Sequence, residues 1–391
     1  MAEEADSKVT KLRSDVEDKF YRHYLTPSNS ILVLNRYTDL KLIGFNPRGM
    51  KFSAADTVSK SSVALKCLNN LQTPADAKHA LREIRLLRRT SHPNMVKLEN
   101  VFSPALCLGD PTIDTVYIVV EKMDSSLTHA INMARIGKHK MTHKHISFLL
   151  YQILCAVKFL HDSGIVHRDL TPDNIGVNEK GCKLKLFGFG LSRKKPDSLQ
   201  MSPYVGTRFY RAPEMILDMD YDFKVDIWSI GCILAEMILK RVLFPGQNYF
   251  LQWVAIVGVL GRPSMGFYAR LQGKARDYAM NTGPDTRKTI DQIIPHSFAY
   301  PEDQDPVTLP NAKNFLMRVL RIDPFERPDI RQTLQHPYVS CWHDDSEVNV
   351  PPIVGYDDGE MQKADEDLEK WRDKITTELK EFQEKHNVFE S

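Results

Sequence analysis

The sequence has little excess charge of either sign, no long apolar run and no closely spaced cysteines. Lysine and arginine total 52 against 50 for aspartate and glutamate, and the formal net charge of +2 argues against nucleic-acid binding driven by bulk charge. No uninterrupted apolar run reaches the ~20 residues that span a bilayer, and the charged first residues lack the apolar core of a signal peptide. We therefore expect a soluble intracellular protein that binds neither nucleic acid nor membrane.

The six cysteines are far apart, and no Cys-x-x-Cys pair or other metal-ligand cluster is present. In a chain of 391 residues this spacing is typical of reduced core thiols in a reducing compartment. The cysteines are Cys67, Cys107, Cys155, Cys182, Cys232 and Cys341.

Composition and periodicity divide the chain into four segments. Residues 1–30 are polar and are expected to form a mobile or surface-laid arm. Residues 31–121 contain short β-rich runs and one helical pattern, and residues 122–340 are dominated by long helical patterns. Residues 341–391 contain a linker-like run and a charged terminal helix. This order predicts an α+β fold with a small β-rich lobe, a larger helical lobe and a ligand cleft between them, with a hinge near Glu121–Asp124.

The terminal segment carries one apolar stripe at intervals of three and four residues, formed by Leu368, Trp371, Ile375, Leu379 and Phe382. We expect this helix to pack back on the protein's own surface. Binding of a partner through the same stripe is the alternative.

Several short motifs follow one another in a fixed order. Gly44 and Gly49 are the outer glycines of a G-x-G-x-x-G turn, Lys66 ends an apolar strand, and Glu83 lies in the next helical pattern; each alone is a weak signal. His167-Arg168-Asp169-Leu170 with Asn174 is far more specific, because a loop after a core helix can place a carboxylate at a substrate hydroxyl and an amide at a cation. Ala212-Pro213-Glu214 and the segment from Asp226 to Gly231 complete the series.

This series resembles the motif set of protein kinases. The segment MSPYVGTRFYRAPE resembles the activation segment of mitogen-activated protein kinases, and Ser202-Pro203-Tyr204 is similar to the Thr-Pro-Tyr of the c-Jun N-terminal (stress-activated) kinase subgroup. The resemblance covers roughly residues 20–385 and implies a two-lobe protein-kinase fold with an activation segment at residues 188–214. It implies ATP and Mg²⁺ as cofactors and proline-directed phosphorylation of Ser/Thr in a MAP kinase cascade.

The resemblance implies a role for each matching residue. Asp169 would orient and deprotonate the substrate hydroxyl, Asn174 would hold Mg²⁺, and Glu214 would form a structural pair with Arg327. Lys66 would contact the ATP phosphates and be held there by Glu83. The full set implied to bind ATP is Ile43, Gly44, Gly49, Lys51, Ala64, Lys66, Glu83, Val120, Glu121, Met123 and Asn174.

Regulation follows from the same resemblance. Ser202 and Tyr204 would be phosphorylated by an upstream dual-specificity MAP kinase kinase, and each phosphate adds about −1.5 to −2 charge. Four arginines would receive these phosphates, namely Arg82 and Arg168 for the first and Arg208 and Arg211 for the second. Plain surface solvation of these arginines is the alternative.

Asp344 and Glu347 match the acidic patch that holds basic docking motifs of activators, scaffolds and substrates, although two carboxylates in a polar loop are also compatible with an ordinary solvated surface. We expect a cytoplasmic monomer. The family also implies a nuclear pool, but the chain has no clear basic import cluster.

The departures from the family pattern lie at the phosphate end of the site. Gly188 replaces the Mg²⁺-binding aspartate of Asp-Phe-Gly, Thr171 replaces the lysine two residues after Asp169, Asn46 replaces the middle glycine, and Lys51 replaces the valine above the adenine. Loss of the principal metal ligand could cost on the order of 10³ in rate. Lys51 could compensate in part if it reached the phosphates.

Two hypotheses follow. In the first, the chain is a MAP kinase-like enzyme with impaired catalysis that rests on Lys66, Glu83, Asp169 and Asn174. In the second, it is a pseudokinase that acts as a phosphorylatable docking scaffold or competitor in stress signalling.

Overall fold

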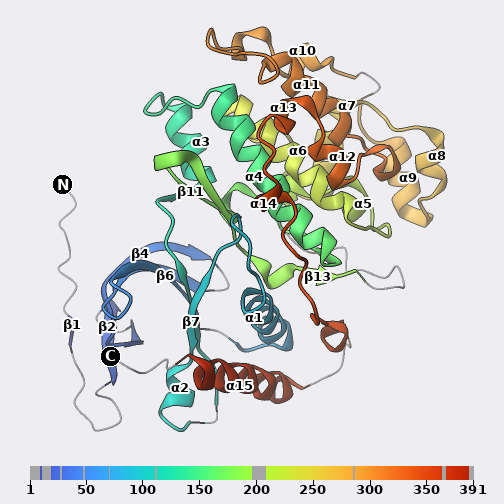
Figure 1. Ribbon diagram of the computed structural model, residues 1–391. Coiled ribbons are helices and arrows are strands. Elements are labelled where there is room, and N and C mark those ends of the chain that lie inside the picture. Colours follow the sequence, from blue (N-terminus) through green and yellow to red (C-terminus); the bar gives the residue numbers. More distant parts are fainter. Residues whose placement is uncertain are drawn as a thin grey trace. The chain divides into compact units, whose positions relative to one another are not determined.

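The computed structural model describes nine stretches of the chain. They are residues 9–10, 19–26, 29–46, 49–69, 71–110, 112–195, 208–284, 287–362 and 367–386. The chain divides into two compact units (Figure 1). Unit 1 comprises Met1–Arg89, Lys97–Lys122 and Glu360–Ser391, and unit 2 comprises Thr90–Val96 and Met123–Gly359. Unit 1 is built on β-sheet and unit 2 is mainly helical, which confirms the predicted α+β fold with two lobes.

Unit 1 contains a five-stranded antiparallel sheet in the order β4-β5-β6-β8-β7. Its strands are β4 (Tyr37–Asn46), β5 (Gly49–Asp56), β6 (Ser61–Leu68), β7 (Leu98–Phe102) and β8 (Val116–Glu121). In β5 and β6 the side chains alternate between fully buried and half-buried positions, as the two-residue period of a strand requires. One face of this sheet is therefore apolar core, and the other carries the polar side chains considered below.

The helix α1 (Pro74–Leu87) begins with a clear start signal. Thr73 precedes it and accepts a hydrogen bond from the Asp76 amide, and Pro74 occupies the first turn, where its missing N–H costs nothing. Its apolar stripe is buried, and Glu83 lies on the buried part of the helix. The short helix α2 (Pro104–Cys107) follows β7.

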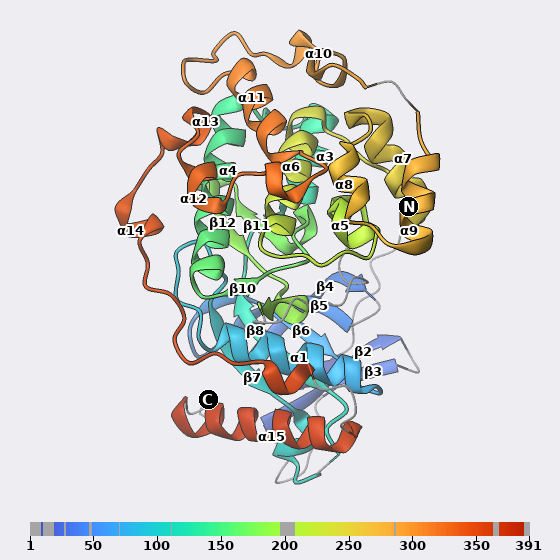
Figure 2. The same ribbon diagram turned by 90° about the vertical axis from the view of Figure 1, so that its right-hand side faces the viewer.

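The terminal helix α15 (Leu368–Lys385) lies beside α1 in both ribbon views (Figures 1 and 2). Trp371, Ile375, Leu379 and Phe382 are buried, and the Lys78 ammonium of α1 lies 4.9 Å from the centre of the Trp371 ring. Arg85 of α1 and Arg88, which directly follows α1, both pair with Glu378 of α15. The apolar stripe therefore packs back on the protein's own helix. The residue limits predicted for the four segments of the chain remain predictions.

Part of the segment predicted as a polar arm forms sheet instead. The strands β1 (Val9–Thr10), β2 (Phe20–Thr26) and β3 (Asn29–Leu34) form a three-stranded antiparallel sheet. Phe20, Tyr21 and His23 are buried there. The overall polar composition of residues 1–30 gave no indication of strand β2, which is stabilised by pairing with β3.

Unit 2 is built around two long helices that pack against each other, α4 (His143–Asp162) and α6 (Lys224–Leu239). Both are apolar on more than one face and almost entirely buried, as expected for core helices. The longer helices beside them are α3 (Leu127–Arg135), α7 (Tyr249–Leu260), α9 (Gly273–Asn281) and α11 (Leu309–Val319). The short helices are α5 (Pro213–Ile216), α8 (Met265–Ala269), α10 (Ile290–Ile293), α12 (Ile330–Leu334), α13 (Pro337–Ser340) and α14 (Asp345–Val348).

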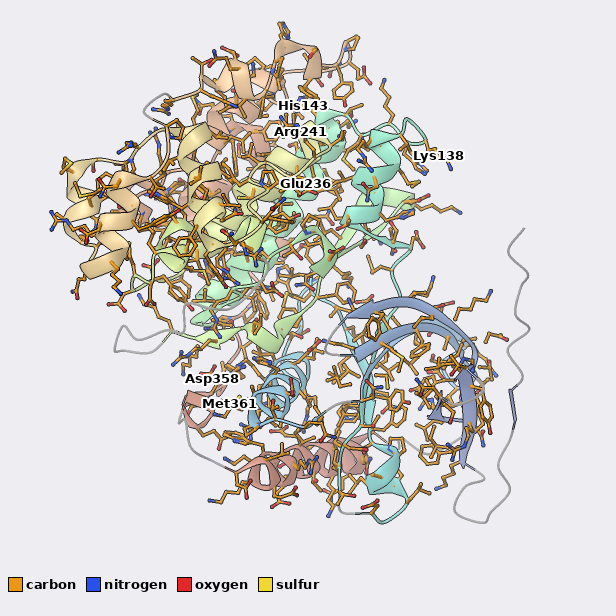
Figure 3. The ribbon with its side chains drawn as sticks, turned by 180° about the vertical axis from the view of Figure 1, so that it is seen from behind. Lys138, His143, Glu236, Arg241, Asp358 and Met361 are labelled. Carbon is orange, nitrogen blue, oxygen red and sulfur yellow. The ribbon has the colours of Figure 1, made fainter. Side chains whose placement is uncertain are left out.

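Short strands and 3₁₀ turns shape the loops of unit 2. The strands β9 (Ser125–Ser126), β11 (Ile175–Asn178) and β12 (Lys183–Leu186) form one small sheet, and β10 (Ile165–Val166) pairs with β13 (Arg193–Lys194). The side chain of Asp358 anchors this second pair by accepting a hydrogen bond from the Lys194 amide at 3.1 Å (Figure 3). The 3₁₀ turns of unit 2 are η2 (Pro172–Asn174), η3 (Lys180–Cys182), η4 (Phe189–Leu191), η5 (Arg208–Tyr210), η6 (His296–Phe298) and η7 (Pro324–Glu326). A further turn, η8 (Gly359–Gln362), begins at the last residue of unit 2 and continues into unit 1.

The negative expectations concern membranes and disulfides. In the part of the chain that the structure describes, no helix is both long and apolar enough to cross a bilayer. All six cysteines are free thiols, and burial raises the pKa of Cys67 to about 11 and that of Cys155 to about 12.

Candidate active site

Five of the predicted ATP-binding residues of unit 1 share one face of its sheet. Gly44 of β4 lies directly opposite Lys51 of β5, which in turn lies opposite Lys66 of β6. In the neighbouring row Ala64 of β6 lies opposite Val120 of β8. Because opposed residues of an antiparallel pair point to the same side, these five residues form a continuous patch.

Lys66 and Glu83 form a close ion pair. The Lys66 Nζ donates a hydrogen bond to Glu83 Oε2 at 2.6 Å, and the two side chains are 21% and 9% exposed. The pair joins strand β6 to helix α1 and fixes the direction of an otherwise flexible ammonium group. A charge held in this way is suited to contact phosphate oxygens.

Gly49 is required by the sheet itself. Its φ is +146°, and a Cβ atom there would lie 2.1 Å from the carbonyl oxygen of Cys67. Gly44 has no comparable restraint, since the nearest atom to its hypothetical Cβ is Lys51 Cδ at 3.8 Å. The two predicted loop glycines therefore differ: Gly49 allows close approach of β5 to β6, whereas Gly44 leaves room above the Lys51 stem.

Three of the residues predicted to bind ATP, Val120, Glu121 and Met123, lie at the end of β8 or shortly after it. Val120 is buried, and Glu121 exchanges hydrogen bonds with Lys97, its carboxylate accepting from the Lys97 amide at 2.8 Å. Ile43 of β4 is exposed. Met123 belongs to unit 2, where its side chain lies against Gly176.

In unit 2 the loop after β10 is held by a buried carboxylate. Asp226 of α6 accepts hydrogen bonds from the amides of His167 at 2.9 Å and Arg168 at 3.0 Å, and one from His161 Nε2 at 2.9 Å. Burial alone would raise the pKa of Asp226, but these donors lower it overall. The motif residue Asp226 therefore organises the loop that carries Asp169.

Asp169 and Asn174 are in direct contact. The Asn174 Nδ2 donates to the carboxylate Oδ2 of Asp169 at 3.0 Å and to its carbonyl oxygen at 2.8 Å. His167 supports the turn by accepting a hydrogen bond from the Asp169 amide through Nδ1. Asp169 also lines a small hollow with Arg211 and Met215. Thr171, where the family has lysine, is buried.

The Asn174 side chain occupies the space beside Gly188. A Cβ atom at Gly188 would lie 2.6 Å from both Cγ and Oδ1 of Asn174. Gly188 also has a φ of +81°, a left-handed conformation that favours glycine. The loss of a carboxylate at position 188 is thus accompanied by close packing of the neighbouring amide.

The arginines predicted to receive phosphate lie in two groups. Arg82 is buried in α1 of unit 1. In unit 2 Arg168 is buried and donates to the Leu191 carbonyl at 2.7 Å and to the Tyr221 hydroxyl at 3.1 Å. Arg208 and Arg211 both lie over the ring of Tyr249. Ser202 and Tyr204 lie outside the described residues.

Sequence reasoning missed Arg193. Burial first, and then the charge of Arg168, lower the pKa of Arg193. Its Nε is buried with no hydrogen-bond partner among the described residues. Arg193 lies five residues after Gly188 in the same segment, but the sequence alone does not place it near Arg168. The charges of Arg168 and Arg193 therefore lie near each other.

Glu214 and Arg327 form a buried bidentate pair. Arg327 Nη1 and Nη2 donate to the two carboxylate oxygens at 2.6 and 2.7 Å, and both side chains are at most 1% exposed. Arg327 also donates to the carbonyls of Arg321, Ile322 and Lys224. With these partners the guanidinium is fully hydrogen-bonded, which is the condition under which a buried charge is tolerated.

Asp344 and Glu347 lie at the start of α14. The Asp344 carboxylate caps this helix by accepting hydrogen bonds from the amide and hydroxyl of Ser346 at 2.8 and 2.7 Å. Burial, and then the charge of Asp344, raise the pKa of Glu347. The two carboxylates therefore lie near each other, and Asp344 in addition has a local structural role.

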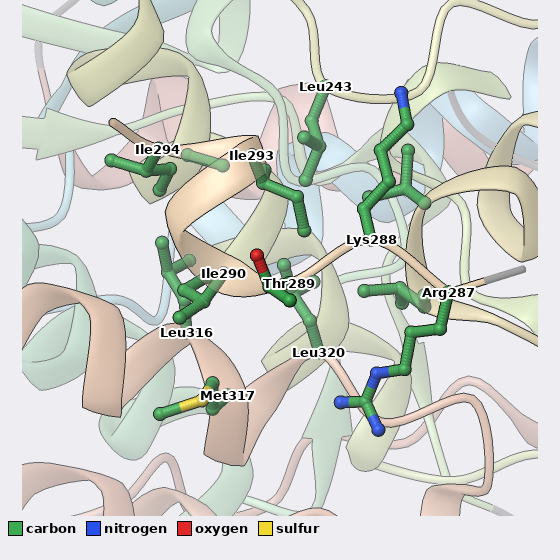
Figure 4. A pocket seen from close by; sticks show the side chains of 13 residues that line it. Leu243, Arg287, Lys288, Thr289, Ile290, Ile293, Ile294, Leu316, Met317 and Leu320 are labelled. Carbon is green, nitrogen blue, oxygen red and sulfur yellow. The ribbon is translucent and has the colours of Figure 1, made fainter.

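A separate cavity lies in unit 2. It measures about 250 Å³ and is lined mainly by apolar side chains, among them Leu243, Ile290, Leu316 and Leu320 (Figure 4). It contains none of the residues predicted to bind ATP or substrate. Across the described ranges no three His, Cys, Asp or Glu side chains are placed to hold a metal ion.

Comparison with known proteins agrees with this geometry. The Protein kinase domain family matches residues 37–339. The chain is 40% identical over 353 residues to "Stress-activated protein kinase JNK" of Suberites domuncula, which covers 90% of this chain and 95% of that protein. It is also 40% identical to "Stress-activated protein kinase jnk-1" of Caenorhabditis elegans, over 92% of this chain and 76% of that protein. "GLH-binding kinase 1" of C. elegans is likewise 40% identical, over 92% of both chains. With the Lys66–Glu83 pair and the Asp169 loop in place, these matches show that the chain belongs to the protein kinase family and is a JNK-like member of its MAP kinases.

Proposed function

We propose that this JNK-like Ser/Thr kinase phosphorylates serine or threonine before proline in a stress-activated cascade, with impaired phosphotransfer. The single observation that carries the proposal is the contact of Asn174 with both Asp169 and Gly188. Asn174 holds the proposed catalytic carboxylate of Asp169, and it packs against a glycine at the position where the family has a metal-binding carboxylate.

The retained chemistry supports an enzyme. The 2.6 Å Lys66–Glu83 pair holds a cation for phosphate, and the Asp169 loop is fixed by Asp226. In kinases the aspartate in this loop accepts the substrate hydroxyl proton, which is a role in general-base catalysis. Neither the Lys66–Glu83 pair nor the position of Asp169 depends on an aspartate at position 188.

The donor set does not fit Mg²⁺ bound as kinases in general bind it. Mg²⁺ prefers an octahedral set of oxygen ligands that includes one or two carboxylates. Gly188 offers none, and residues 183–193 contain no carboxylate. The Asn174 Nδ2 donates to Asp169, which leaves its Oδ1 as an amide ligand without the neighbouring carboxylate. We therefore infer that Mg²⁺ binding is weakened.

The same observation favours a second candidate function, a pseudokinase that acts as a phosphorylatable docking scaffold or competitor. The space where the family's metal-binding carboxylate would lie is not left empty. Asn174 packs closely against Gly188, so the surrounding structure is adapted to the absence of that carboxylate. The acidic residues Asp344 and Glu347 supply a surface for basic docking motifs of activators, scaffolds and substrates.

Phosphotransfer to a Ser-Pro peptide tests the two candidates. We expect slow transfer by the native chain, its loss in Asp169→Asn, and its retention in the matched control Asp173→Asn, an exposed carboxylate of the same loop. A silent native chain with an active Gly188→Asp/Thr171→Lys variant would support the scaffold instead. Silence in both chains contradicts the enzyme proposal.

The docking surface has an independent test. Asp344→Asn with Glu347→Gln removes the two charges and keeps a capping residue at position 344. We expect weaker binding of a basic docking peptide, measured by fluorescence polarisation, and no change in Glu326→Gln, an exposed carboxylate elsewhere in unit 2. Unchanged binding in the double variant would remove this surface from the proposal.

A further inference from the structure

The cavity of unit 2 has walls made of core side chains (Figure 4). Leu243, Ile294, Leu316 and Leu320 line it and are buried. They come from segments in or directly beside α6, α10 and α11. Because side chains of a close-packed core are held in place by their neighbours, these walls are both apolar and fixed in position.

The volume of the cavity suits a short hydrocarbon chain. It measures about 250 Å³, whereas an apolar cavity of about 150 Å³ is large enough to bind benzene. A water molecule occupies about 30 Å³ in the liquid, and on that scale the cavity holds about eight non-hydrogen atoms. An aliphatic group of this size gains free energy when it leaves water for apolar walls.

Two cations stand at the mouth of the cavity. Arg287 and Lys288 line it and are exposed, and Figure 4 shows their side chains leaving the connecting segment in opposite directions. Neither forms an ion pair with any residue that the structure describes. Asp291, the acidic residue of α10, is paired with Lys313 of α11. The mouth therefore carries positive charge that an anionic head group would neutralise.

Thr289 adds a hydroxyl group to this mouth. Its Oγ1 accepts a hydrogen bond from the Gln292 amide at 3.2 Å and so begins α10. A hydroxyl both accepts and donates, so its hydrogen remains available for a ligand oxygen. The segment is attached to α7, since the Lys288 amide donates to the Val259 carbonyl at 3.2 Å. The polar groups at the mouth are therefore held beside the apolar walls.

We propose that this cavity binds an amphiphile with an anionic head group and one aliphatic chain of about eight carbons. The chain lies among the buried leucine and isoleucine side chains, and the head group contacts Arg287, Lys288 and the Thr289 hydroxyl. Guanidinium and ammonium groups bind carboxylate and phosphate oxygens through charge-assisted hydrogen bonds. The inference is independent of the proposed function, because none of the described residues that line the cavity is predicted to bind ATP, substrate or docking peptides.

The residue types at the cavity argue against other ligands. The described residues that line it include no carboxylate, histidine or cysteine for a metal ion and no aromatic ring for a nucleobase. A neutral hydrocarbon would fit the walls but would leave the two cations without a counter-charge. A fatty acid and an alkyl phosphate share the required chemistry, and the choice between them is made by experiment.

Titration calorimetry with the full chain tests the proposal, using octanoate, octyl phosphate, octan-1-ol and butyrate below their micelle-forming concentrations. We expect saturable binding of one octanoate or octyl phosphate per chain. Octan-1-ol has the same chain without the charge and should bind about tenfold more weakly. Butyrate keeps the charge and lacks four methylene groups, so it should bind at least about thirtyfold more weakly.

Three variants locate the binding site. Arg287→Gln with Lys288→Gln removes both charges at exposed positions and should weaken octanoate binding about tenfold, with little change for octan-1-ol. The matched control, Lys274→Gln with Arg276→Gln, removes two exposed cations of α9 that do not line the cavity and should change neither affinity. Ile293→Trp places a larger side chain in the cavity and should abolish binding of both compounds. Thermal unfolding of each variant without ligand is measured alongside, to detect folding defects.

Each outcome decides for or against the proposal. Saturable octanoate or octyl phosphate binding that depends on the charges at positions 287 and 288 supports it. Tighter binding of octanoate then assigns the site to fatty acids, and tighter binding of octyl phosphate assigns it to lipid phosphates. Absence of saturable binding, equal affinity for octan-1-ol and octanoate, or equal affinities of the charge variant and its control overturns the proposal. None of these results affects the kinase proposal, which rests on other residues.

Discussion

The two groups of functional side chains have changed in opposite directions. In unit 1 the sheet face keeps its Lys66–Glu83 pair and carries an additional cation at position 51. In unit 2 the loop keeps Asp169 and Asn174, lacks a carboxylate at position 188 and has Thr171 where the family has lysine. The sheet of unit 1 thus has a positive charge at position 51 that the family pattern lacks, whereas the loop of unit 2 lacks a negative charge at position 188.

The difference also concerns packing. Lys51 sits at a half-buried position of a sheet, where a long side chain is accommodated without moving its neighbours. Position 188 is enclosed, and the neighbouring amide has filled it. Substitution of Lys51 by the family's valine should therefore leave neighbouring side chains in place. Substitution of Gly188 by aspartate should displace neighbouring side chains.

Breaking the buried Glu214–Arg327 pair of unit 2 should have the largest effect on stability. Arg327→Ala leaves the buried Glu214 carboxylate unpaired, and we expect a loss of about 3–5 kcal/mol in the free energy of unfolding, measured by urea denaturation. Arg331→Ala is the matched control, because its pair with Asp162 is 66% exposed on the arginine side and should contribute at most about 1 kcal/mol. Equal losses in the two variants would contradict the structural role of the Glu214 pair.

Restoring the carboxylate at position 188 tests the packing difference. We expect Gly188→Asp to cost about 1–3 kcal/mol because the new side chain meets Asn174. Gly181→Asp is a close control, since Gly181 has the same φ of +81° but no atom within 4 Å of its hypothetical Cβ.

A double-mutant cycle identifies the clash. In an Asn174→Ala background the cost of Gly188→Asp should fall by about 1 kcal/mol or more. An unchanged cost would show that backbone conformation, and not Asn174, resists the carboxylate. Urea denaturation of the four chains supplies the data.

Weakening the Lys66–Glu83 ion pair of unit 1 should have a smaller effect, on ATP affinity. Glu83→Gln keeps the shape of the side chain and loses its charge, so we expect ATP affinity to fall about fivefold, equivalent to about 1 kcal/mol. The control is Glu381→Gln, an exposed carboxylate of α15. If titration calorimetry gives the same affinity for Glu83→Gln and the native chain, the ion pair does not position Lys66 for phosphate.

A pH-sensitive contact is confined to unit 2 and affects stability only in acid. Burial, and then the charge of Arg318, lower the pKa of His336 from 6.5 to about 4, and its Nδ1 accepts the Tyr338 amide hydrogen. The unfolded chain therefore takes up a proton that the folded chain does not, and stability falls as the pH drops from about 6.5 to 4. His336→Asn, which keeps a helix-capping side chain, should flatten this dependence in denaturation measured across that range. His296→Asn at an exposed position should not.

Much of the fold could be predicted from periodicity. The alternating strands and the long apolar helices α4 and α6 follow directly from residue spacing. The strand β2 could not be predicted, because its stability depends on pairing with β3 and its surroundings in the chain are polar. Local composition does not report such non-local pairing.

The site was predictable where spacing and geometry coincide. Motif order was enough to suggest the Lys66–Glu83 contact and the Glu214–Arg327 pair, which come from residues 17 and 113 positions apart. The filling of the space at Gly188 by Asn174 was not predictable, since it depends on the rotamer of a side chain fourteen residues earlier. The opposition of Lys51 and Lys66 required the strand register, and Arg193 required the position of Arg168.

The return of α15 to α1 has a consequence for synthesis. Arg88, at the end of α1, contacts Glu378, which is 290 residues later in the chain. At typical elongation rates of about 5–20 residues per second, the first helix emerges from the ribosome roughly 15–60 s before its covering helix is made. During that interval the apolar side of α1 lacks its final neighbour, so nascent chains should depend on chaperones until the last helix has been translated.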